Sequence, residues 1–134
     1  MADAVSTHIL HESKQRHIAK FSNVSDGTGE ADVVKIDVSA LTIPCAEVDI
    51  LGLWFSTDGM AVRIEWDATT DTVAWLVPAN QTGYLDFTKT FPGKLRNDSG
   101  SGKTGDVLFT TIGHTAGDTY TIILDCAKRL TAEV

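Results

Sequence analysis

The sequence predicts an all-β fold, a single antiparallel β-sandwich or jelly-roll-like domain of about eight or nine strands with little or no helix. Short runs in which apolar and polar residues alternate recur along the chain, and turn-forming Gly, Asp, Asn and Pro residues separate them. No segment has the 3.6-residue apolar period of an amphipathic helix. A chain of 134 residues also suits one domain, which buries about two-thirds of the surface that the open chain exposes.

The N-terminal part divides into an arm and the start of the domain. Residues 1–14 are interpreted as an N-terminal arm or a weak strand around Thr7–His11, and residues 15–134 as the sandwich domain. The pattern predicts a strand over about residues 16–24 and a loop over 25–30. In the next run, alternation places four apolar residues on one face: Val34, Ile36, Val38 and Ala40.

Segment 46–55 is apolar on both of its faces. Val48, Ile50 and Trp54 occupy one face. Leu51, Leu53 and Phe55 occupy the other. Such a run predicts a central strand that is covered on both sides, by the core and by another subunit. The Asp58-Gly59 pair that follows predicts a tight type I′ hairpin.

The C-terminal half continues the alternation. Segment 61–67 places Val62, Ile64 and Trp66 inward. After a turn at 68–71, Val73, Trp75 and Val77 share a face, and Pro78 ends that strand because it lacks a backbone donor. Further strands are predicted at about 84–90, at 107–112 and from residue 119, the last with four inward residues: Tyr120, Ile122, Leu124 and Cys126.

The segment SGSGKTG, residues 99–105, resembles the end of a phosphate-binding loop. The motif G-x-x-x-x-G-K-[ST] requires a glycine where this chain has Asn97, and it requires a helix after Thr104. Residues 107–112 instead alternate as a strand does, so no helix N-terminus is available for a phosphate. We expect no nucleotide cofactor, and we interpret Lys103 as a solvated charge or a contact in an interface.

Composition restricts the partners. Eighteen acidic and eleven basic residues give a net charge of −7, which disfavours nucleic acid and anionic membranes as partners. No run approaches the roughly 18 apolar residues of a membrane span, and the N-terminus lacks the pattern of a signal peptide. We therefore expect the chain to fold in the cytoplasm where it is made. Cys45 and Cys126 are too few for a metal framework, and their pairing stays open.

Three groups of residues are candidates for a metal or ligand site. In a regular strand His8 and His11 lie on opposite faces, which disfavours a shared zinc ion. The acids that bracket turns, Asp67 with Asp71 and Asp26 with Glu30, lack the ligand spacing of a dedicated calcium site. Three tryptophans are candidates for a sugar-stacking platform, but the neighbours of two of them favour a place in the core: Trp54, Trp66 and Trp75. Neither a nucleophile–base pair nor a metal motif is evident, and we expect no enzymatic activity.

Four stretches of the sequence resemble a known family of proteins. GMAVRIEWDATTD, GYLDF and GSGKTGDVLFTTIGHTAGDTYTIILDCAKR, together with IAKFSNVSDGTGEADVVKIDVSAL, resemble small β-sandwich virion structural proteins of tailed bacteriophages. The likeness covers about residues 18–129. It implies a capsid decoration, or cement, protein on the virion surface that binds across major capsid subunits, usually as a homotrimer. Its alternatives are a neck, tail or baseplate component and a carbohydrate-binding or receptor-binding module.

Contact elements are expected where loops or exposed apolar residues could reach a partner. These are the N-terminal arm, the loop over residues 26–30, the strand over 46–55 and the loop over 97–105. The residues predicted to form the interface are His8, His11, Asp26, Glu30, Leu51, Leu53, Phe55, Asn97, Ser99 and Lys103.

Overall fold

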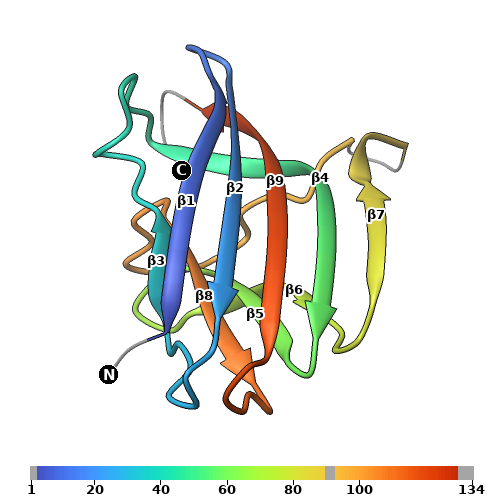
Figure 1. The fold of residues 1–134 in the computed structure, drawn as a ribbon. Helices are drawn as coiled ribbons and strands as arrows, with labels where there is room; N and C mark the ends of the chain where they lie inside the picture. Colours follow the sequence, from blue (N-terminus) through green and yellow to red (C-terminus); the bar gives the residue numbers. More distant parts are fainter. Residues whose placement is uncertain (1–2, 90–92, 130–134) are drawn as a thin grey trace.

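Two antiparallel β-sheets packed face to face make up the protein (Figure 1). This computed structural model describes residues 3–89 and 93–129. The described residues form nine strands and one single-turn 3₁₀ helix, η1 (Phe87–Lys89). The strands are β1 (Ala4–Glu12), β2 (Arg16–Val24), β3 (Val33–Ile36), β4 (Glu47–Asp58), β5 (Ala61–Trp66), β6 (Thr72–Val77), β7 (Thr82–Asp86), β8 (Val107–Ile112) and β9 (Thr119–Arg129). The all-β sandwich is therefore confirmed.

The strand order brings the last strand, β9, to the centre of the larger sheet, between β2 and β4. One sheet has the order β1-β2-β9-β4-β7, and the other has the order β3-β8-β5-β6. The core lies between them, where alternate residues of each strand point inward. The largest side chains with less than 2% exposure include Trp66, Tyr120, Phe21 and Phe109. Phe109 touches both Phe21 and Tyr120 edge to face, with ring centroids 5.3 and 5.7 Å apart.

The N-terminal segment is a full strand. Residues Ala4–Glu12 pair with β2 in antiparallel register and form one edge of the five-stranded sheet. Eight of the nine residues of β1 are exposed. Apolar Val5, Ile9 and Leu10 each have more than half of their surface open to solvent. The edge strand is thus attached to the domain by its hydrogen bonds to β2 and buries little of its own surface.

The hairpin predicted at Asp58-Gly59 is wrong. β4 belongs to the five-stranded sheet and β5 to the four-stranded sheet, so this turn carries the chain from one sheet to the other. Gly59 does adopt a positive φ of 87°, and an added Cβ would clash with the side chain of Asp118. The sequence signal reports the backbone conformation of the turn. Whether the strands on either side of the turn pair with each other in one sheet depends on tertiary packing.

A β-bulge in β4 overturns the predicted faces of residues 46–55. The register of β4 on β9 shifts between Ile50 and Gly52, with Leu51 as the extra residue. Before the bulge the inward residues are Val48 and Ile50, and after it the next inward residue is Leu53. Trp54 therefore lies on the outer face, where it is 40% exposed. A bulge shifts the period of two by one residue, and alternation in the sequence cannot show where that happens.

Two other predicted faces are also wrong. In β3 a register shift between Val34 and Ile36 leaves Val34 exposed while Ile36 is buried. In β6, Trp75 and Val77 lie opposite the buried Ile64 and Val62 as predicted, but the register shift before Trp75 leaves Val73 50% exposed and buries Ala74 instead. The faces predicted for β5 and β9 are confirmed, since the inward residues of both strands are buried.

Candidate functional site

The outer face of the five-stranded sheet carries two distinct rows of side chains. Residues opposite each other in neighbouring strands share a face, so the register defines each row. One row crosses all five strands as His8, Lys20, Ile123, Trp54 and Tyr84. The next row consists entirely of hydroxyl residues: Ser6, Ser22, Thr121, Ser56 and Thr82.

Trp54 and Tyr84 form an exposed aromatic stack at one end of the first row. Their ring centroids are 4.3 Å apart and their planes differ by 20°. Tyr84 is 48% exposed and lies over Gly52, where an added Cβ would be 3.4 Å from the ring. The glycine thus leaves room for the phenol ring, and Tyr84 in turn supports one face of the Trp54 indole.

A shallow hollow lies beside Trp54, between the two rows. Its volume is about 190 Å³, and most of its lining is apolar. The lining residues are Trp54, Phe55, Ser56, Thr82, Gly83, Thr121 and Ile123. The hydroxyl oxygens of Ser56 and Thr82 are 3.1 Å apart and share a hydrogen bond. The hollow combines an aromatic wall with uncharged hydroxyl groups.

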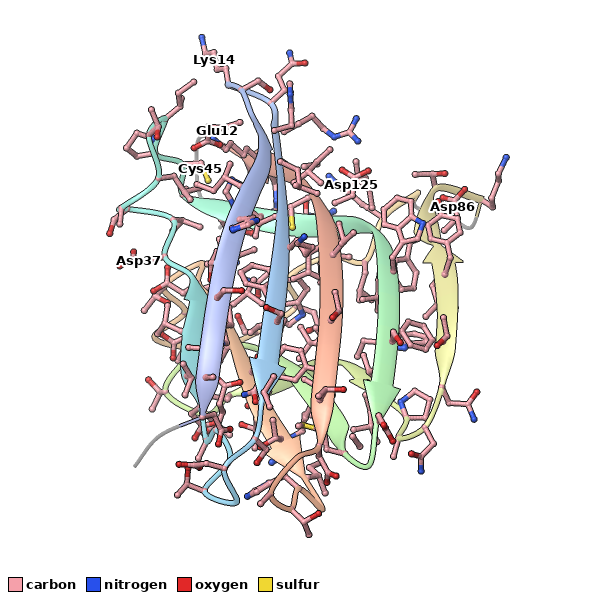
Figure 2. All side chains as sticks on the ribbon, in the orientation of Figure 1. Glu12, Lys14, Asp37, Cys45, Asp86 and Asp125 are labelled. Carbon is pink, nitrogen blue, oxygen red and sulfur yellow. The ribbon has the colours of Figure 1, made fainter. Side chains whose placement is uncertain are left out.

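Two acids lie in the row on the other side of the stack. Gly52 pairs with Asp125 of β9 and with Asp86 of β7, and both acids are labelled in Figure 2. Partial desolvation and these two carboxylates raise the pKa of Tyr84 above its ordinary value. Asp125 itself forms a bidentate ion pair with Arg16, whose Nη2 donates to both carboxylate oxygens at 2.7 Å and whose Nε donates to Oδ1 at 3.1 Å.

The other half of the β4 outer face is buried and charged. Glu47 is 1% exposed and Asp49 is 0% exposed. Asp49 accepts hydrogen bonds from the backbone N–H of Asn97 at 3.0 Å and from Arg129 at 2.8 Å, and its second oxygen is 3.1 Å from Lys94 Nζ. Each of these buried charges depends on its partners, because removing one partner leaves an uncompensated charge inside the protein.

Lys103 provides another of these partners. Its Nζ is 3.2 Å from Glu47 Oε2. The interpretation of Lys103 as a solvated charge is therefore wrong, because Glu47 is buried. The strand predicted at residues 107–112 is confirmed as β8, so the segment SGSGKTG leads into a strand and lacks the helix that a phosphate-binding loop requires.

The loop that contains Lys103 packs against β4. Leu95 and Ile50 exchange two backbone hydrogen bonds of 2.7 and 2.9 Å, and Asn97 and Ser99 are 5% and 8% exposed. Ser99 Oγ donates to the side-chain oxygen of Asn97. Both residues were predicted as interface contacts, but their burial leaves little side-chain surface for a partner.

Hydrogen bonds from other parts of the chain fix the predicted contact loop at residues 26–30. Asp3 accepts hydrogen bonds from the Asn23 side chain and from the backbone N–H groups of Asp26 and Gly29. Although partial burial opposes ionisation, these bonds lower the pKa of Asp3 to about 2. Glu30 is only 8% exposed, and its carboxylate accepts a 2.5 Å bond from Tyr120 and faces Lys35 at 2.5 Å. Asp26 is half-buried.

The histidines are placed differently from what the spacing predicted. A register shift between Ile9 and His11 puts His8 opposite Lys20 and His11 opposite Ile18. The prediction of opposite faces is thus wrong: both exposed rings share the outer face. His17 is buried, and its Nδ1 is 3.1 Å from Glu12 Oε1.

The apolar residues of β4 that were predicted for the interface are buried or half-buried. Leu53 is 0% exposed and belongs to the core, and Phe55 is half-buried and packs against it. Leu51 is half-buried at the bulge. The large apolar residue of this strand that is exposed on the outer face is Trp54, whereas alternation predicts that it shares the face of Val48 and Ile50. Of the tryptophans, Trp66 is in the core as predicted.

Sequence reasoning missed most of the residues around the hollow. Tyr84, Ser56, Thr82, Thr121 and Ile123 come from three strands, and only the register brings them together. The signal that could have found them is the run of Ser and Thr at outward positions beside aromatic residues. The bulge at Leu51 hides that signal, because it changes which residues of β4 point outward.

Three acids lie together on the four-stranded sheet. Carboxylate oxygens of Asp32, Glu65 and Asp71 lie within 4.8 Å of one another. Burial, opposed by a hydrogen bond from Thr110 and assisted by the nearby Asp32, raises the pKa of Glu65. The Nε atom of Arg63 is 3.4 Å from Glu65 Oε2, so this carboxylate has a cationic neighbour within the chain. Asp71, which the sequence paired with Asp67 across a turn, therefore lies with Asp32 and Glu65 in the folded protein.

The cysteines are not paired with each other. Cys45 and Cys126 are free thiols, and burial raises the pKa of both.

Within the described part of the chain, no helix has the length and apolar character needed to cross a membrane. No protein-family model matches this sequence, and no curated protein is significantly similar to it.

Proposed function

We propose that this chain is a structural protein of a bacteriophage virion, a capsid decoration protein that binds across neighbouring major capsid subunits and stabilises the head. The resemblance of residues 18–129 to small virion proteins is the reason for proposing this class of protein. The observation that carries the assembly role is the exposed edge strand β1.

β1 has the properties of a strand that a partner covers. It pairs with β2 along one edge, and within residues 3–89 and 93–129 no strand pairs with its other edge. Val5, Ile9 and Leu10 are 51%, 53% and 53% exposed. A long edge strand with free backbone groups and exposed apolar side chains is a template for pairing with another chain. We assign this surface to a subunit of the shell.

Decoration works through mass action. A protein that binds only the assembled shell stabilises that state by an amount that grows with its concentration relative to its Kd. A homotrimer placed at a symmetry axis of the shell would engage three sites at once, which converts weak single contacts into avidity. This mechanism requires no catalysis, and it uses an edge strand whose side chains stay exposed until assembly.

The test combines imaging with two matched variants. In an electron-microscopy reconstruction of the virion that carries this chain, we expect trimers on the head. Ile9→Lys in β1 and Leu76→Lys in β6 change residues that are both 53% exposed. Particles assembled without the chain are expected to bind the Leu76→Lys protein normally and the Ile9→Lys protein at least about tenfold more weakly, as for a lost apolar contact.

Two outcomes would contradict the proposal. A ring of six or twelve copies at the neck, tail or baseplate would assign the chain to a different part of the virion. Equal binding of the two lysine variants to particles would show that β1 is not the contact surface. Thermal unfolding of both variants, measured beforehand, ensures that the comparison is made between folded proteins.

A further inference from the structure

We propose that the hollow beside Trp54, on the outer face of the five-stranded sheet, binds a saccharide. The site lies on β4, β7 and β9, whereas the proposed shell contact lies on β1, at the edge of the same sheet. The inference is independent of the proposed function, since it depends only on the chemistry of the residues that line the hollow.

The aromatic wall matches the apolar face of a sugar ring. One side of a pyranose presents C–H groups, which pack favourably on the flat face or edge of an indole. Trp54 is 40% exposed and lines the hollow, and its contact with Tyr84 holds the indole in place. A ring that is already immobilised loses little conformational entropy when a ligand binds.

Hydroxyl residues beside Trp54 provide partners for the hydroxyl groups of a sugar. Ser56, Thr82 and Thr121 line the hollow, and each hydroxyl group has one donor and two acceptor positions. The single hydrogen bond between Ser56 and Thr82 uses only part of this capacity. Because the lining contains no charged residue, a neutral ligand can bind without desolvating an ion.

Size and composition favour a saccharide over a protein segment. A volume of about 190 Å³ is below the roughly 300–1,000 Å³ of pockets for drug-sized ligands, and it suits a single ring. The row of hydroxyl residues also continues through Ser22 to Ser6, which provides polar positions for further sugar units along the sheet.

The experiment uses the full chain and a defined set of probes. Binding would be screened on immobilised glucose, galactose, mannose and N-acetylglucosamine oligomers and on bacterial O-polysaccharides, and then measured by calorimetry with the strongest probe. Four variants are compared: Trp54→Ala, Trp54→Phe, Thr82→Val and, as a control, Leu76→Ala. Leu76 has an exposure of 53% but lies on the other sheet, so it matches Trp54 only as an exposed apolar residue.

We expect a graded result. Trp54→Ala weakens binding at least about tenfold, Trp54→Phe restores part of the loss, and Leu76→Ala has no effect. Thr82→Val keeps the shape of the side chain and removes its hydroxyl group, so it weakens binding by about threefold to tenfold without altering the stack. Thermal unfolding of each variant identifies any loss that is due to misfolding, and Thr82→Val keeps the test valid if Trp54→Ala fails to fold.

The inference is overturned if the wild-type protein binds no probe at low-millimolar concentration. It is also overturned if a folded Trp54→Ala or Thr82→Val protein binds the saccharide as tightly as the wild type. Weaker binding of Trp54→Ala to virus particles, without any binding of the wild-type protein to saccharides, would identify this face as a protein interface.

Discussion

The two halves of strand β4 present opposite chemistry on the same outer face of the sheet. Before the bulge at Leu51, the outward residues are the carboxylates Glu47 and Asp49, and both are buried. After the bulge, the outward residues are Trp54 and Ser56, and both are exposed. Charges are thus enclosed and an aromatic ring is open to solvent, the reverse of what polarity alone favours.

The cover over each half explains this inversion. The segment around Leu95–Lys103 lies on the first half and supplies cations and backbone donors to the buried acids. Among the described residues, no segment lies over Trp54 and Tyr84. The loss of a partner from a buried charge destabilises the fold, whereas an exposed aromatic stack contributes less to stability and is available for binding.

Deleting Leu51 tests the boundary between the two halves and is expected to have the largest effect. Without the extra residue, every outward side chain on one side of the deletion must turn inward, which places Trp54 or Asp49 in the core. We expect a loss of about 4 kcal/mol or more, or no cooperative unfolding at all, in urea denaturation followed by circular dichroism. Leu51→Ala, which keeps the bulge, is expected to cost only about 1 kcal/mol.

Asp49→Ala tests whether the covered half is structural. Removing this carboxylate leaves Arg129 and Lys94 without one of their partners in a buried setting, so we expect a loss of about 3–5 kcal/mol in urea unfolding. Asp58→Ala, at an exposed position of the same strand, is expected to change stability by about 0.5 kcal/mol or less. Equal effects of the two substitutions would contradict the structural role of the covered half.

Glu65→Gln extends the comparison to an acid on the other sheet and is expected to have the smallest effect. The pKa of Glu65 is raised in the folded protein, chiefly by burial, so its ionised form destabilises the fold once the pH exceeds the ordinary value of 4.5. The glutamine variant should therefore have a higher melting temperature than the wild type at pH 7. The difference should shrink as the pH falls and vanish below about pH 4.5. A variant that melts lower at pH 7 would show that the ion pair with Arg63 outweighs burial.

Much of the fold could be predicted from the local pattern. The strands at β2, β5, β8 and β9, and the inward faces of β5 and β9, match the alternation of their residues. These strands are long or regular enough for the period of two to hold along the inward residues. The prediction that residues 107–112 form a strand also correctly removed the phosphate-binding loop from consideration.

The errors have a common physical origin. The bulges at Leu51, in β3 and in β1 shift the alternation, and they misplaced Trp54, Val34 and His11 relative to their neighbours. The loop composition also gives no sign that Asn97 and Lys103 contact the buried acids Asp49 and Glu47 of β4. Both effects depend on partners that are distant in the sequence.

The sequence alone therefore determined that the chain forms strands, where most of them lie, and that turns rather than helices connect them. These properties follow from local sterics and from the alternation of side chains across a strand. The tertiary structure decided which strands share a sheet, which face Trp54 occupies and which acids are buried. It decided them because register, bulges and long-range ion pairs are set by residues that meet only when the two sheets pack together.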